Sequence, residues 1–276
     1  MLGEALTTGA SHDHLDVARQ AIGRLATNDS SATLVRAWHV AVAGYLAGGV
    51  SPSAFLAHVV EIRRRYPSDP GALLAVAIGY ERIADSPFRP STNIPEFIDP
   101  ETNRPVREGQ SAVPYEMERA RWLDLAASCY RRALAQTPDD GDARFRLGRV
   151  LVLSGRYEEA ALELARCERG ASVPSHRFLG ALFLGMALDG KHRETEAIEA
   201  YRRARTLFPL ARSSAFALSE LLYRTGNVAE ATAAVGEVCT RRPPPRLDDD
   251  PWWTFQYDWG PRVEQALKDL DKAVAQ

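Results

Sequence analysis

The stretch "LFLGMALDGKHRETEAIEAYRRARTLFP", residues 182–209, predicts two short amphipathic helices joined by a turn. Gly185 lies in the first of these helices, twelve residues before Ala197 in the second. The same arrangement recurs in residues 142–167 and again in residues 215–243. The chain therefore repeats one helix–turn–helix unit, and the spacing between equivalent residues gives the length of the repeat.

That length is 34 residues, with one copy extended to 37. The alanine of the second helix recurs with offsets of 34, 37 and 34 at Ala126, Ala160, Ala197 and Ala231. The bulkier residue four places later keeps the same offsets at Tyr130, Leu164, Tyr201 and Val235. The small residue of the first helix steps by 37 and 34 at Gly148, Gly185 and Ser219. Because these series share one period, they describe a structural repeat with a single three-residue extension near 171–177.

The residue types at these positions have a physical reason. A small residue in the first helix and an alanine in the second allow two antiparallel helices to approach closely. The bulky residue four places after each alanine lies on the same helical face and fills the space beside the next pair. A proline such as Pro209 cannot continue the second helix and sets the turn into the next unit. One pair buries too little apolar surface alone, so the pairs must stack.

These spacings resemble the tetratricopeptide repeat, an antiparallel helix pair of about 34 residues. The residues that carry the resemblance are Leu147, Gly148, Leu184, Gly185, Ala197, Tyr201, Ala204 and Pro209. Ser219 in place of glycine, and Cys167 and Val238 in place of the later alanine, depart from the family pattern without changing its register. The resemblance is specific over residues 120–245. It implies an all-α, right-handed superhelical solenoid of stacked antiparallel helix pairs, with about five pairs plus terminal capping helices.

We expect one solenoid to span residues 1–276. Its expected parts are a capping helix in 1–31, degenerate repeats in 32–84, an insertion in 85–114, well-formed repeats in 115–245, and an aromatic cap with a helix in 246–276. The insertion separates Gly79 from Ala126 by 47 residues where the other repeats have twelve, and its six prolines exclude a continuous helix. Residues 115–135 then predict one long helix. The insertion either crosses the groove as a lid or packs on the outer surface.

The segment "PWWTFQYDWG", residues 251–260, holds three of the five tryptophans. Because the last pair of a stacked array has an exposed apolar side that must be covered, this segment is expected to cap the array. A saccharide or partner platform built on Trp252 and Trp253 is the alternative.

Composition excludes several classes of function. A net charge of −2 gives no electrostatic basis for binding nucleic acid or an anionic membrane. The three cysteines are far apart and form no CxxC pair, so we expect neither a metal site nor a disulfide framework, and each cysteine should pack as a small apolar residue. No run of eighteen apolar residues occurs. The predominance of arginine over lysine is typical of a GC-rich bacterial genome. A cytoplasmic protein is predicted, with an exported mature chain lacking its targeting segment as the alternative.

No catalytic or nucleotide-binding motif is present, so we expect no enzyme activity and no cofactor. In the family that the repeats resemble, peptide ligands lie in a concave groove lined by the first helices. Carried onto this sequence, the groove-facing candidates are Tyr80, Phe145, Arg149, Phe216, Glu220, Tyr223 and Arg224. The predicted function is an interaction scaffold that binds a protein or peptide partner there. The alternative is an enzyme or small-ligand binder in which Glu96, Asp99 and Glu101 meet Arg149.

Overall fold

The computed structural model describes residues 67–85, 97–98, 105–106, 115–240 and 249–257. The chain divides into two compact units, one made of Met1–Gln136 with Trp259–Gln276 and the other of Thr137–Asp258. Several predictions fall outside the described residues, namely the N-terminal capping helix, most of the 85–114 insertion with Glu96, Asp99 and Glu101, and the helix expected near the C-terminus.

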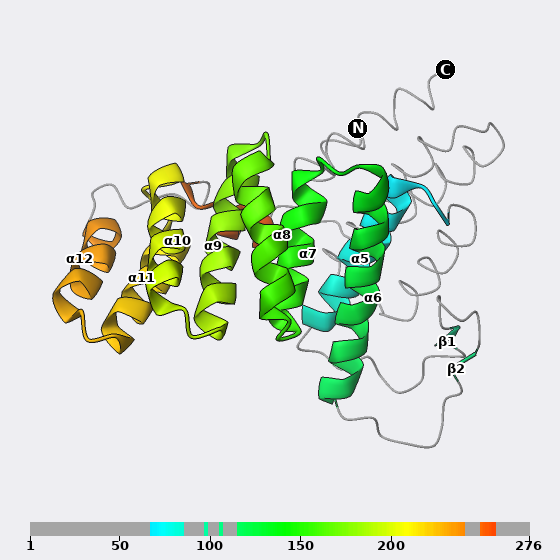
Figure 1. Ribbon diagram of the computed structural model, residues 1–276, viewed down its shortest axis with the longest axis horizontal. Helices are drawn as coiled ribbons and strands as arrows, with labels where there is room; N and C mark the ends of the chain where they lie inside the picture. Colours follow the sequence, from blue (N-terminus) through cyan, green and yellow to red (C-terminus); the bar gives the residue numbers. More distant parts are fainter. Residues whose placement is uncertain (1–66, 86–96, 99–104, 107–114, 241–248, 258–276) are drawn as a thin grey trace, which may run out of the picture. The chain divides into compact units, whose positions relative to one another are not determined.

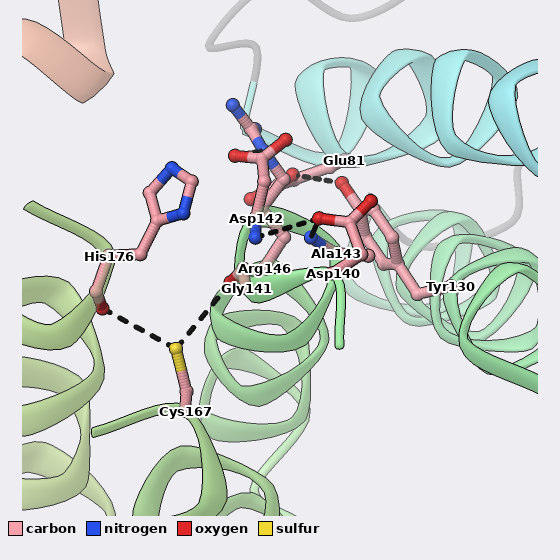
Figure 2. A network of polar contacts seen from close by, with 9 residues as sticks. All are labelled: Glu81, Tyr130, Asp140, Gly141, Asp142, Ala143, Arg146, Cys167 and His176. Atoms are coloured by element: carbon pink, nitrogen blue, oxygen red, sulfur yellow. Dashed lines mark hydrogen bonds and ion pairs between the residues drawn. The ribbon is translucent and has the colours of Figure 1, made fainter. Parts of the chain in front are cut away.

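In the first unit, helix α5 (Pro70–Asp85) packs against helix α6 (Tyr115–Gln136). This pairing confirms that the two helices on either side of the insertion form one pair, and α6 is the long helix that the sequence predicts. The Tyr130 hydroxyl donates a 2.6 Å hydrogen bond to the buried carboxylate of Glu81, which ties the two helices together (Figure 2). Within the insertion, Phe97–Ile98 (β1) and Pro105–Val106 (β2) form a short antiparallel pair that the helical periodicity does not predict.

The second unit is a stack of antiparallel helix pairs (Figure 1). Its helices are α7 (Gly141–Leu153), α8 (Tyr157–Gly170), α9 (Pro174–Gly190), α10 (Glu194–Leu207), α11 (Arg212–Arg224), α12 (Val228–Cys239) and the short α13 (Pro251–Tyr257). From α7 to α12 each helix packs on the next one, and α7 also packs on α9, the first helix of the following pair. The predicted all-α solenoid is therefore confirmed.

The small residues lie at the helix crossings, as predicted. A Cβ atom added to Gly148 would overlap the side chain of Leu164, and one added to Gly185 would overlap the ring of Tyr201. In the third pair the Ser219 hydroxyl donates a 2.8 Å hydrogen bond to the carbonyl oxygen of Ala231. This bond shows why serine can replace glycine there: its hydroxyl is small and finds an acceptor on the facing helix.

The turns between paired helices keep the same period. Gly155, His192 and Gly226 have φ angles of 71°, 58° and 84°, and they occupy equivalent positions in the three pairs. This left-handed conformation costs glycine nothing, because glycine has no Cβ atom. His192 adopts it with a full side chain, so the middle turn is strained relative to the other two.

The loop before α7 is held by polar contacts (Figure 2). Asp140 accepts hydrogen bonds from the backbone N–H groups of Asp142 (2.9 Å) and Ala143 (3.1 Å) and so caps the helix. The Cys167 thiol lies 3.5 Å from the carbonyl oxygen of Gly141 and 3.4 Å from that of His176. Burial raises the pKa of this thiol to about 12. Cys129 is also buried, whereas Cys239 is exposed, which corrects the expectation that all three cysteines pack inside.

Candidate binding face

Helix α11 presents one row of exposed side chains. Phe216, Glu220, Tyr223 and Arg224 are exposed and follow the i, i+4, i+7, i+8 spacing that places residues on one face of a helix. Phe216 is 49% exposed and Tyr223 is 66% exposed, although both are large aromatic residues. The opposite face of α11 is buried in the stack through Ala215, Leu218, Leu221 and Leu222.

Helix α9 continues this row into the preceding repeat. Met186 is 39% exposed and occupies the position equivalent to Glu220. Arg224 donates hydrogen bonds of 2.6 and 2.7 Å to the two carboxylate oxygens of Asp189. These bonds raise the pKa of Arg224, and the charges of Glu220 and Glu194 act in the same direction. The Arg224 guanidinium, a predicted groove-facing candidate, is thus engaged by a neighbouring repeat.

Two other candidates lie on α7, where they are covered. Phe145 is 1% exposed and Arg149 is 6% exposed. The Phe145 ring meets the ring of Phe255 edge to face at 5.3 Å, and the Arg149 guanidinium lies 5.4 Å from the centre of the Phe255 ring. The expectation that both residues are available to a ligand is therefore corrected, because α13 lies on them.

The remaining candidate, Tyr80 in α5, is fully buried. Its ring stacks on that of Trp122 at a centroid distance of 5.6 Å, so it contributes to the α5–α6 pair rather than to an open surface. The expectation that Tyr80 faces an open groove is therefore corrected, because its ring is buried against α6.

The aromatic segment near the C-terminus covers part of the second unit. Trp252 packs edge to face on Phe183 of α9 at 5.5 Å, and Phe255 contacts Phe183 at 6.4 Å (α13 in orange-red beside α9, Figure 1). Arg146 and Arg149 of α7 also lie against Phe255, at 4.7 and 5.4 Å from the ring centre. The predicted cap on the last pair is thus corrected: the described part of this segment, residues 249–257, lies on the first helices α7 and α9.

A buried carboxylate holds α13 in this place. Asp250 is 2% exposed and accepts hydrogen bonds of 2.8 Å from both the backbone N–H and the hydroxyl of Ser213, at the start of α11. The same carboxylate accepts a 3.0 Å bond from the backbone N–H of Trp252 and so caps α13 itself. Asp250 is not among the residues predicted from the sequence; its position directly before a proline and an aromatic run was the available signal.

We call the surface presented by the first helices α7, α9 and α11 the first-helix face; its residues are Phe145, Arg146, Arg149, Phe183, Met186, Asp189, Phe216, Glu220 and Tyr223. Equivalent positions along it differ in exposure from repeat to repeat. Phe145 is 1% exposed and Leu182 is 4% exposed, whereas Phe216 at the same place in the next repeat is 49% exposed. The first-helix face is therefore covered by α13 over α7 and part of α9, and open over α11.

The described residues give little support to a metal site, a membrane-spanning helix or a sugar-binding platform. Among them, no group of three His, Cys, Asp or Glu side chains is arranged to hold a metal ion. No described helix is long and apolar enough to cross a membrane. Trp252 packs against Phe183 and Phe255, so aromatic residues of the same chain contact its ring.

Comparison with known proteins agrees with this architecture. The family model described as Tetratricopeptide repeat matches residues 116–172 and 184–244. No curated protein sequence matches the chain. Among solved structures, the MamA RS-1 ArsTM double mutant has 18% sequence identity and a TM-score of 0.51, covering 83% of this chain and 94% of its own. PilF of Pseudomonas aeruginosa has 17% identity and a TM-score of 0.51, covering 85% and 97% respectively. These structural likenesses concern the fold alone.

Proposed function

We propose that the chain, which matches the tetratricopeptide-repeat family model over residues 116–172 and 184–244, is a scaffold that binds a peptide or protein segment on its first-helix face, without covalent chemistry. The observation that carries this proposal is the exposure of Phe216 and Tyr223 on either side of Glu220 on α11. Large aromatic side chains are enriched at protein interfaces, where they bury much area at a small cost in side-chain entropy. Their exposure on one helix face therefore supports a binding surface at this place.

The polar groups around these rings support the same proposal. Asp189 holds Arg224 across the boundary between two repeats, so the open part of the face is built from more than one pair. Glu220 adds an exposed carboxylate between the two aromatic residues. A partner segment would bury its apolar side chains on Phe216, Tyr223 and Met186 and place a hydrogen-bond donor on Glu220. No specific observation favours the enzyme or saccharide alternative. A cytoplasmic location in a bacterium remains a prediction from composition.

The test compares two tagged variants of the 276-residue chain with the unsubstituted chain in capture from an extract of the native host. Phe216→Ala with Tyr223→Ala removes the aromatic residues of the open face. Leu162→Ala with Val228→Ala is the matched control, because these side chains are 58% and 51% exposed on the second helices α8 and α12. Interface residues of this kind each contribute about 1–2 kcal/mol or more, so the first variant should lose at least about tenfold in captured partner.

The control variant should retain the partner, and both variants should keep the helical circular dichroism of the unsubstituted chain. Equal capture by the Phe216/Tyr223 variant would show that the partner binds elsewhere. An equal loss of captured partner in both variants would show that exposed apolar side chains bind non-specifically anywhere on the surface. The assignment of the binding site to the first-helix face would then be wrong.

A further inference from the structure

Helix α13 is seated on the first-helix face in the manner of a bound peptide. It is a short helix of seven residues, and two of its aromatic side chains, Trp252 and Phe255, are three residues apart and so lie on one side of it. Both contact the ring of Phe183 on α9. Two anchors one turn apart on a short helix are the usual means by which a helical peptide is held on another protein.

The surface beneath α13 is unusual for a permanent core. Arg146 and Arg149 are 8% and 6% exposed, and charged side chains are rarely so deeply buried unless they are paired. Arg146 donates a 3.1 Å hydrogen bond to Asp142, and both guanidinium groups lie within 6 Å of an α13 ring, at 4.7 Å from Phe255 for Arg146 and 5.9 Å from Trp252 for Arg149. Arginine and aromatic side chains are both enriched at protein interfaces relative to the rest of the surface.

Beneath α13, the helix crossings are already filled by side chains of the repeats themselves. Leu164 fills the space beside Gly148, and Tyr201 fills the space beside Gly185. Both fillers come from the second helix of the same pair, so the pairs are packed by side chains of the repeat itself. Helix α13 therefore adds a layer on top of α7 and α9, as a ligand does.

We propose that the α7–α9 part of the first-helix face is a recognition site for a short helix that carries an aspartate followed by aromatic residues two and five places later, and that α13 occupies this site within the same chain. A partner segment with this chemistry binds by displacing α13. Asp250, Trp252 and Phe255 provide the pattern: the carboxylate reaches Ser213, and the rings cover Phe183, Arg146 and Arg149. This inference rests on the proposed function and names the class of partner.

The test uses a fluorescein-labelled peptide of residues 247–257, "LDDDPWWTFQY", titrated with the full chain and read by fluorescence anisotropy. The full-chain variant Trp252→Ala with Phe255→Ala weakens the internal copy and should bind the peptide more tightly. A tethered segment has an effective concentration of about 1 mM, so for an intrinsic dissociation constant of about 10–100 µM the gain should be about 10- to 100-fold.

Matched controls identify the site. Leu162→Ala, an exposed change on α8, should bind the peptide as weakly as the unsubstituted chain. A peptide with alanine in place of both Trp252 and Phe255 should not bind the variant. Adding Arg149→Gln to the variant should weaken binding several-fold, because the guanidinium that faces both rings is lost.

Equal peptide binding by the variant and the unsubstituted chain would overturn the proposal, because no internal competitor would then exist. If the double variant loses its cooperative unfolding transition, peptide binding is measured with the Asp250→Ala variant instead. This change removes the bonds to Ser213 without opening an apolar cavity. Tighter peptide binding by Asp250→Ala would support the proposal, and unchanged binding would make α13 a permanent layer. Neither failure affects capture through Phe216 and Tyr223, so the two proposals are tested separately.

Discussion

The same substitution at two helical glycines should change stability in opposite directions. Gly185 in α9 lies against Tyr201, and a Cβ atom there would lie 2.8 Å from the Cζ atom of the ring and closer still to two other ring atoms. Gly236 in α12 has no heavy atom within 4 Å of its added Cβ position. Replacing each by alanine therefore separates helix propensity from packing.

The magnitudes follow from these two environments. Alanine is about 1 kcal/mol better than glycine inside a helix, so Gly236→Ala should raise the free energy of unfolding by about that amount. Gly185→Ala gains the same propensity but must move a ring that is 3% exposed and enclosed on all sides. Overpacking of this kind costs about 2–3 kcal/mol, so the net result should be a loss of about 1–2 kcal/mol.

The assay is urea unfolding followed by circular dichroism at 222 nm, with both variants and the unsubstituted chain measured together. Tyr201→Leu serves as the coupling partner, because a smaller side chain at this position should relieve part of the cost of Gly185→Ala in a double-mutant cycle. If Gly185→Ala stabilises the protein as much as Gly236→Ala does, α9 and α10 do not approach closely at Gly185. The explanation that small residues are needed at the helix crossings would then be refuted.

Three further changes test local features of the second unit. His192→Gly should raise the free energy of unfolding by about 1 kcal/mol, since His192 has a φ angle of 58° where the equivalent turns have glycine; urea unfolding checks the sign. Asp140→Ala should lower it by about 1 kcal/mol through loss of the helix cap, whereas its exposed neighbour Asp139→Ala should leave it nearly unchanged. Iodoacetamide at pH 8 should modify Cys239 and spare Cys167, as read by mass spectrometry. Burial raises the pKa of the Cys167 thiol to about 12 in the folded chain. The preference of the folded chain for the protonated thiol therefore adds its full stabilisation below about pH 9, and this stabilisation is lost as the pH rises from there towards 12.

The predictions that hold are those that depend on contacts inside one repeat. Gly185 meets Tyr201 sixteen residues away, and Ser219 bonds to Ala231 twelve residues away. Such contacts are set by helix geometry and by the length of one turn, both of which the periodic spacing reports directly. The pairing of α5 with α6 is also predicted, because the small and bulky residues keep their roles on both sides of the insertion.

The candidate residues are exposed only where nothing lies on the repeat, and their role in binding stays a prediction. Phe216, Glu220 and Tyr223 are exposed on α11 as the family register implies, whereas Phe145 and Arg149 occupy the same kind of position and are covered. Register places a side chain on a face of its helix. It carries no information about a distant segment that packs on that face.

The sequence by itself determined the helix pairs, their period, their crossings and the turns between them, because each depends on residues within about one repeat length. Only the tertiary structure decided that the aromatic segment 251–257 lies on α7 and α9 instead of on the end of the array. The same hydrophobic gain is available wherever an apolar surface is left open, so burial alone does not choose the place. The place where the segment packs is determined by the hydrogen bonds from Ser213 to Asp250 and by the contact of Phe255 with Arg146. These contacts exist only once the chain has folded back.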